Sequence, residues 1–249
     1  MSSLQPKRFS IRDIAAALAE GWLTFRAMPG PSIAFAAVFA LIGLILLVAV
    51  GLLGISPLVL PLAGGFMLVG PALLAGFFEL FRVYSSGARP QALHALGGFR
   101  GAPAGLWLVA AVCAFLFLIW IADVGVLYSF IVGGEHLPYE LPWLIRLQET
   151  VVAFEVWASL MGSVLAFIIF AISAFSVPLL YERRADPVGG VHASVRAVFG
   201  NLVAAILWGV LLSVTTILAI LLLPLLLVVL PVLAYASFVL YRRVFPLET

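Results

Sequence analysis

Two acidic side chains near the ends of neighbouring apolar stretches are the first candidates for chemistry. Asp123 closes one stretch and Glu155 opens the next. Two carboxylates that face each other can bind a cation or share a proton, because their negative charges repel unless one is neutralised. The favoured interpretation is two acids solvated separately at helix ends. Both residues are carried forward as candidates for ion or partner contact.

A third acidic candidate is Glu79, which precedes Arg82 by three residues at the end of another apolar stretch. Ionisable groups near a membrane span often form gates or proton relays, because burying charge in lipid is costly. The favoured interpretation is an ion pair between successive helix turns at the level of the lipid headgroups. Glu182 with Arg183 and Arg184 is interpreted in the same way.

The three histidines are weak candidates for metal or haem ligation. Bis-histidine haem needs two imidazoles that reach one iron from packed helices. His94 and His192 lie in polar segments between apolar stretches, and His136 lies on the other side of the predicted membrane. We therefore expect no haem, metal or other cofactor, and keep His94 and His192 as candidates for ion or partner contact. The single cysteine, Cys113, excludes a disulfide within the chain.

We find no motif typical of an enzyme. The sequence has no nucleophile–base spacing and no glycine-rich phosphate loop, so we expect no catalytic activity. Proline and glycine interrupt the second apolar stretch, as in the broken helices that form ion sites in transporters. Close packing of helices through small residues is the favoured explanation.

Six apolar stretches must position these residues. About 20 apolar residues are needed to cross about 30 Å of hydrocarbon, and six stretches meet this requirement: 33–53, 58–81, 104–122, 151–180, 202–220 and 222–241. The last two are nearly continuous, and Pro224 and Pro231 offer places for a tight turn. The predicted fold is an all-α bundle of six transmembrane helices arranged as three hairpins.

The basic residues predict the orientation of these spans. Twelve of the thirteen Lys and Arg residues fall on one side, and only Arg146 falls on the other. The positive-inside rule then places both termini in the cytoplasm, and we predict a bacterial-type inner membrane. No cleaved signal peptide is expected. The only outer segment of any length is 124–150.

The composition agrees with a membrane protein. Hydrophobic residues make up 65% of the chain and charged residues 10%, with a mean hydropathy of +1.24, whereas soluble domains are about 25% charged. Because the basic residues flank apolar spans and form no stripe of their own, no nucleic-acid partner is expected.

Three polar segments on the inner side read as interfacial helices. Residues 11–28 are amphipathic, with Ile11, Ile14, Leu18, Trp22 and Phe25 at helical spacing. Segments 90–101 and 187–200 resemble each other, and together the three suggest a repeat of interfacial helix and hairpin. We predict a single integral membrane domain over 1–249, divided into 1–32, 33–101, 102–200 and 201–249.

Several short motifs resemble an integral membrane family of bacteria catalogued as a domain of unknown function. They are Gly21-Trp22, Pro29-Gly30-Pro31, Glu79-Leu80-Phe81-Arg82, Tyr181-Glu182-Arg183, His94-Ala95 and His192-Ala193, and they extend over nearly the whole chain. Some members of that family carry a provisional label as a cytochrome c oxidase subunit. The resemblance therefore implies association with the respiratory chain but assigns no catalytic residue, and the lack of histidines within spans argues against a haem-bearing subunit.

These observations predict a non-catalytic accessory or scaffold subunit of a larger membrane complex, with the lipid bilayer and other membrane subunits as partners. The alternative is a transporter or channel for a small or lipid-like substrate. A third hypothesis is a membrane-organising protein whose inner helices sense or bend the leaflet.

Overall fold

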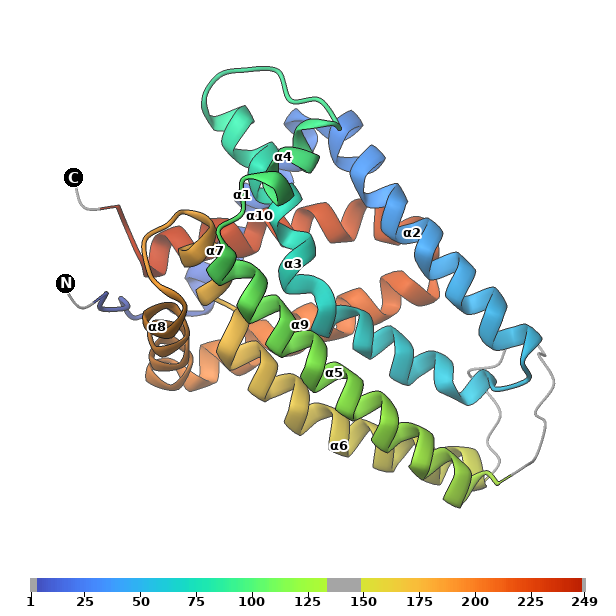
Figure 1. Cartoon of the computed structure of the whole chain (residues 1–249). Helices are drawn as coiled ribbons and strands as arrows, with labels where there is room; N and C mark the ends of the chain where they lie inside the picture. The colour runs from blue at the N-terminus through green and yellow to red at the C-terminus, as the bar shows by residue number, and fades with distance from the viewer. Residues whose placement is uncertain (1–3, 134–148, 248–249) are drawn as a thin grey trace.

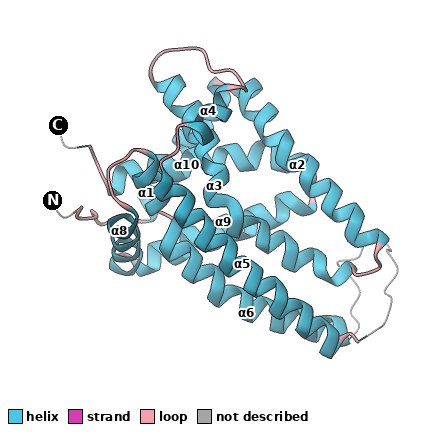
Figure 2. Ribbon diagram, in the orientation of Figure 1, coloured by secondary structure: helices cyan, strands magenta, loops and turns pink. Residues whose placement is uncertain are grey.

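The computed structural model describes residues 4–133 and 149–247, and within these ranges the side chains of residues other than 56, 60 and 64–72. The described residues form helices and no strands (Figure 2), which confirms the predicted all-α class. The ten α-helices of this part are α1 Ile11–Ala27, α2 Pro29–Leu52, α3 Val59–Ser85, α4 His94–Arg100, α5 Ala104–Ile131, α6 Glu149–Ser173, α7 Ser176–Tyr181, α8 Pro187–Gly200, α9 Leu202–Leu221 and α10 Leu226–Val244.

Five segments of the described chain are long and apolar enough to cross a membrane. They are α2, α5, the combined segment of α6 and α7, α9, and Leu223–Val244, which contains α10. Each coincides with one predicted span. The second predicted span lies in α3, which is not among the five. The fold is therefore that of a polytopic helical membrane protein, while the count of six crossings stays a prediction.

In Figure 1 the two ends of the described chain lie at the left, α2, α5 and α6 extend toward the lower right, and α9 and α10 cross the view at an angle to them. The turn between α2 and α3 lies at that far end. Helices α5 and α6 run side by side, and the ring of Trp120 in α5 fills the space next to Gly162 in α6.

The predicted span over 151–180 is confirmed as one segment, Glu149–Tyr181, long and apolar enough to cross a membrane, but its helix is interrupted between α6 and α7. Pro178 has no N–H to donate to the preceding turn. At the break, Ser194 of α8 donates to the carbonyl of Ala171 at 2.8 Å and accepts the N–H of Phe175 at 3.1 Å. A buried break is tolerated here because a neighbouring hydroxyl satisfies the freed backbone groups.

The predicted outer loop over 124–150 is also partly wrong. Helix α5 continues to Ile131, and α6 begins at Glu149, whereas residues 134–148, with His136 and Arg146, lie outside the described residues. The extension of α5 packs against α6: Val124 is buried, and the rings of Tyr128 and Phe154 are 5.5 Å apart. This packing outweighs the weak loop signal of the sequence.

Of the two prolines that offered a place for the turn between the last two helices, the structure uses Pro224. Helix α9 ends at Leu221, and the 3₁₀ turn η3 (Leu223–Leu225) contains this proline. Pro231, the other candidate, lies inside α10.

The polar segments form helices as predicted, although one is shorter than expected. Helices α1 and α8 match 11–28 and 187–200 closely, while α4 covers only His94–Arg100 of the predicted 90–101. Of the apolar residues expected on one face of α1, Ile14 and Phe25 are buried in the chain, while Ile11 and Trp22 are exposed.

Helix α1 buries a face of small residues against α10. This face includes Ala17, Gly21 and Thr24. A Cβ atom on Gly21 would lie 2.8 Å from both the amide nitrogen of Ala236 and the carbonyl oxygen of Val232. Only glycine allows the two backbones to approach this closely, as in packed transmembrane helices. The buried face of α1 thus combines these small residues with Ile14 and Phe25.

Gly21→Ala is expected to destabilise the protein by about 1–3 kcal/mol, because the added methyl group forces α1 and α10 apart. Thermal unfolding of the purified protein in mild detergent measures this change. Gly30→Ala is the matched control, since a Cβ at Gly30 meets nothing within 4 Å. Equal melting temperatures for the two variants would contradict the close contact.

Candidate functional site

The ends of three helices, α3, α7 and α10, meet around a cluster of buried aromatic rings. The ring of Phe78 lies 4.6 Å from that of Phe238 and 5.6 Å from that of Tyr181. The rings of Phe238 and Tyr241 are 5.7 Å apart. These contacts bring together helix ends that are far apart in the sequence, and with them the charged residues that follow each apolar segment.

Glu79 is the centre of the first polar group at these helix ends. It is 8% exposed, and its two carboxylate oxygens accept hydrogen bonds from Arg82 Nε at 2.9 Å and Arg82 Nη2 at 2.6 Å. The hydroxyl of Tyr181 also donates to Glu79 Oε2. The predicted ion pair between Glu79 and Arg82 is confirmed, and its bidentate geometry is the strong form of this interaction.

Helix α4 lies over Glu79. A Cβ on Gly97 would be 3.7 Å from Glu79 Cγ, so the glycine leaves room for the carboxylate. His94 begins the same helix, and its Nδ1 accepts the N–H of Gln91 at 2.9 Å. His94 therefore has one nitrogen engaged in the turn before α4.

Glu182 is the centre of a second polar group. It accepts hydrogen bonds from the hydroxyl of Tyr241 at 2.8 Å and from Arg242 Nη2 at 2.6 Å. The predicted ion pair of Glu182 with Arg184 is confirmed, with Arg184 Nη1 4.0 Å from Glu182 Oε2. The predicted pairing with Arg183 needs correction, because Arg183 Nη2 donates to the carbonyl of Gly101.

Arg184 has another role at the end of α10. Its Nη1 donates to Tyr241 Oη at 2.9 Å and to the carbonyl of Phe245 at 2.6 Å, and its Nη2 donates to the carbonyl of Pro246 at 2.8 Å. A guanidinium has five donors in a fixed plane, so one side chain holds the last turn of α10 and the segment that follows it.

The two groups share a pattern. Tyr181, at the end of α7, donates to Glu79 of α3, and Tyr241, at the end of α10, donates to Glu182, which directly follows α7. Each later helix end is thus joined to the preceding one by a tyrosine–carboxylate hydrogen bond. Both carboxylates also accept hydrogen bonds from arginine. This arrangement suits a structural role, holding helix ends together, better than acid–base catalysis.

Tyr181→Phe is expected to destabilise the protein by about 1.5–3 kcal/mol, because Glu79 loses a hydrogen bond to its charged carboxylate while the ring packing remains. Thermal unfolding in detergent measures the effect. Tyr84→Phe is the control, because Tyr84 lies on the same helix as Glu79 and is 41% exposed. A shift no larger than that of the control would show that this hydrogen bond contributes nothing.

The structure does not join Asp123 to Glu155. Asp123 is exposed on α5, and Glu155 is half-buried on α6. No hydrogen bond or ion pair connects them among the described residues. One carboxylate oxygen of Glu155 is buried without a hydrogen-bond partner. The two carboxylates are thus separate, as the favoured interpretation has it, but one oxygen of Glu155 is buried rather than solvated.

His192 is exposed on α8, and it makes no polar contact with the described residues. Within residues 4–133 and 149–247 no three His, Cys, Asp or Glu side chains are placed to hold a metal ion.

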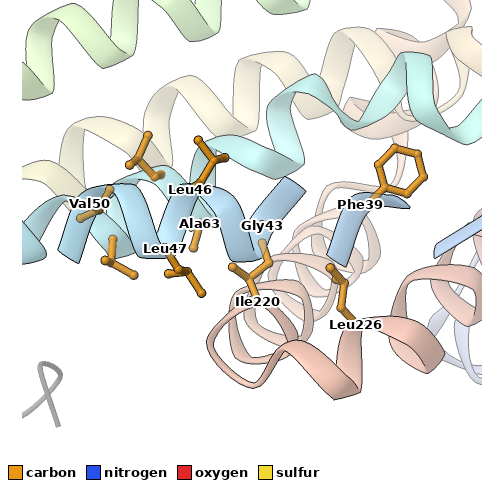
Figure 3. Close-up of a pocket in the computed structure, with 10 residues that line it drawn as sticks. Phe39, Gly43, Leu46, Leu47, Val50, Ala63, Ile220 and Leu226 are labelled. Carbon is orange, nitrogen blue, oxygen red and sulfur yellow. The ribbon is translucent and has the colours of Figure 1, made fainter. Parts of the chain in front are cut away.

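A groove between α2, α3 and the turn joining α9 to α10 has only apolar walls (Figure 3). Its lining includes Phe39, Leu46, Val50, Ile220 and Leu226. Such a groove accepts apolar groups, but it offers no polar side chain to orient a hydrophilic substrate.

Sequence reasoning missed Tyr181, Tyr241 and Arg242 as members of the polar groups. Their signal was present, because Tyr181-Glu182-Arg183 and Tyr241-Arg242-Arg243 follow apolar segments in the same way. Only the packing of α3, α7 and α10 shows which tyrosine meets which carboxylate.

Fold and polar groups together define a polytopic helical membrane protein. Residues 59–182, just under half of the chain, match a family described as "Predicted integral membrane protein (DUF2189)". The match confirms the resemblance to a membrane family of unknown function. It covers α3 to α7 with Glu79, Asp123 and Glu155, and not the Gly21-Trp22 or His192-Ala193 motifs. No curated protein and no solved structure matches the chain.

Proposed function

We propose that this protein is a non-catalytic accessory or scaffold subunit of a larger complex in the inner membrane. Its six predicted spans leave both termini in the cytoplasm, and a respiratory cytochrome oxidase is the candidate complex. The observation that carries the proposal is the use of polar groups. The described carboxylates that are buried at the helix ends bind side chains of the chain itself, while the apolar helix surfaces remain uncovered.

The exposed apolar helix surfaces are suited to pack against other membrane subunits. Along α2, Val38, Leu41, Ile45 and Leu52 are each at least 45% exposed. In a bilayer such surfaces contact lipid tails or the helices of other subunits, and helix association there depends on packing. A protein that offers long apolar faces and few free polar groups is suited to support other subunits.

Charge supports the proposed orientation. The predicted inner side carries twelve basic residues, and the described acids Glu20, Glu79 and Glu182 each pair with an arginine there. Both termini lie at the same side of the view in Figure 1, as an even number of crossings requires.

The orientation predicts the outcome of topology reporters. A reporter fused after Thr249 is expected to be active in the cytoplasm, and a short tag inserted after Gly133 is expected to be accessible from outside. Gly133 is chosen because it follows the end of α5 and an added Cβ there meets nothing within 4 Å. Labelling of intact cells, with permeabilised cells as the control, measures both. Labelling of the two sites on one side would contradict the six-span arrangement.

The accessory role predicts stable partners. The tagged chain, purified from its native membrane in mild detergent at native expression level, is expected to co-elute with other membrane subunits in fixed ratio. Mass spectrometry identifies the partners, and haem bands in the visible spectrum would identify an oxidase. A colourless, monodisperse protein without partners would contradict the role.

That contrary outcome would favour the second candidate, a transporter or channel for a small or lipid-like substrate. The observation behind it is Glu155, whose buried carboxylate oxygen has no hydrogen-bond partner. A carboxylate within a membrane segment marks an ion or proton path in many transporters. Asp123 is exposed, so Glu155→Gln is the first variant for transport measurements.

A further inference from the structure

An open hollow lies where the start of α1 meets the start of α9. Its walls are formed by residues 9–12 on one side and residues 200–204 on the other, and its volume is about 690 Å³. The polar network of the helix ends does not contribute to this lining. The hollow therefore has its own chemistry, which none of the proposed roles uses.

The two walls of the hollow are held together. The N–H of Phe9 donates to Asn201 Oδ1 at 3.1 Å, and the N–H of Lys7 donates to the carbonyl of Val244 at 2.9 Å. Phe9 is buried, and its ring lies 5.8 Å from that of Phe175. The segment before α1 is thus attached to α9 and α10, and the hollow is preformed.

One wall carries a positive charge that is free to bind an anion. Arg12 is exposed and forms no ion pair with the described acids. The neighbouring acid, Asp13, accepts hydrogen bonds from Ser10 N and Ser10 Oγ, both at 2.8 Å. These hydrogen bonds keep the pKa of Asp13 below its usual value. Asp13 is therefore engaged with Ser10, and the charge of Arg12 is left available.

Besides Arg12 and the polar residues Ser10 and Asn201, the lining of the hollow consists of apolar residues and Gly200, and its apolar part continues along a membrane helix. Ile11 is 60% exposed and Val203 is 73% exposed. From Val203 the exposed apolar side chains run along α9 through Ile206, Leu207, Val210 and Val214. Their spacing of three or four residues forms one stripe. Because α9 is long and apolar enough to cross a membrane, this stripe leads from the hollow into the hydrocarbon region.

We propose that the hollow binds one anionic phospholipid, with its phosphate on Arg12 and an acyl chain along the α9 stripe. A cation above an apolar stripe matches the anionic head and apolar tail of such a lipid. A free anion would leave the stripe unused. The proposal does not depend on the accessory-subunit role, since the hollow is built by this chain alone.

Lipid titration of the full chain in mild detergent, followed by native mass spectrometry, tests the site. The probes are phosphatidylglycerol and zwitterionic phosphatidylcholine. Arg12→Gln is expected to weaken phosphatidylglycerol binding about tenfold, the scale of one charge-assisted contact. Arg89→Gln is the matched control, because Arg89 is exposed at another inner loop and does not line the hollow. Binding by this control should equal that of the unmodified protein.

A second pair of variants tests the apolar wall. Val203→Trp is expected to fill the hollow and weaken binding of both lipids, whereas Val156→Trp, at an exposed site of α6, should not. Thermal unfolding confirms that each variant is folded. Equal losses for Arg12→Gln and Arg89→Gln, or no preference for phosphatidylglycerol, would overturn the proposal. Displacement of lipid by equal concentrations of glycerol phosphate would assign the site to a soluble anion instead.

Discussion

The cost of placing charge in hydrocarbon governs this structure. Most charged residues lie at the ends of apolar segments, and Glu79 and Glu182, which are largely buried there, need partners. They find them by accepting hydrogen bonds from arginines and from tyrosines of other helix ends. The same bonds that satisfy the carboxylates hold α3, α7 and α10 together. The arrangement of the helix ends at this end of the bundle thus follows from the need to neutralise the buried carboxylates and to satisfy their hydrogen bonds.

Close packing at small residues joins further helices to those held by the polar groups. Gly21 lets α1 lie directly on the backbone of α10, and Ser194 bridges the break between α6 and α7. Both contacts join segments that the predicted series of interfacial helices and hairpins treats as separate units. Helix α1, which its polarity pattern places at the membrane surface, is therefore also part of the helix bundle. Its other face is left to contact lipid.

The functional picture follows from where polar groups remain free. The tyrosine–carboxylate groups are satisfied within the chain and serve its architecture. Glu155 and Arg12 differ from these groups. Glu155 lies within a membrane segment and has a carboxylate oxygen without a hydrogen-bond partner. Arg12 lies beside an open hollow, and its acidic neighbour Asp13 is engaged with Ser10. An accessory protein that also holds an anionic lipid is consistent with these positions.

The sequence by itself determined the class of the protein, its helical segments and the Glu79–Arg82 pair, because apolar length and i,i+3 spacing are local properties. It also limited the turn between the last two helices to the neighbourhood of Pro224 or Pro231, since proline acts on its own backbone. Only the tertiary structure decided that α6 and α7 separate, that α5 runs on to Ile131, and that Glu182 binds Arg242. Each of these depends on contacts between segments distant in the chain, and no local pattern specifies which distant groups will meet.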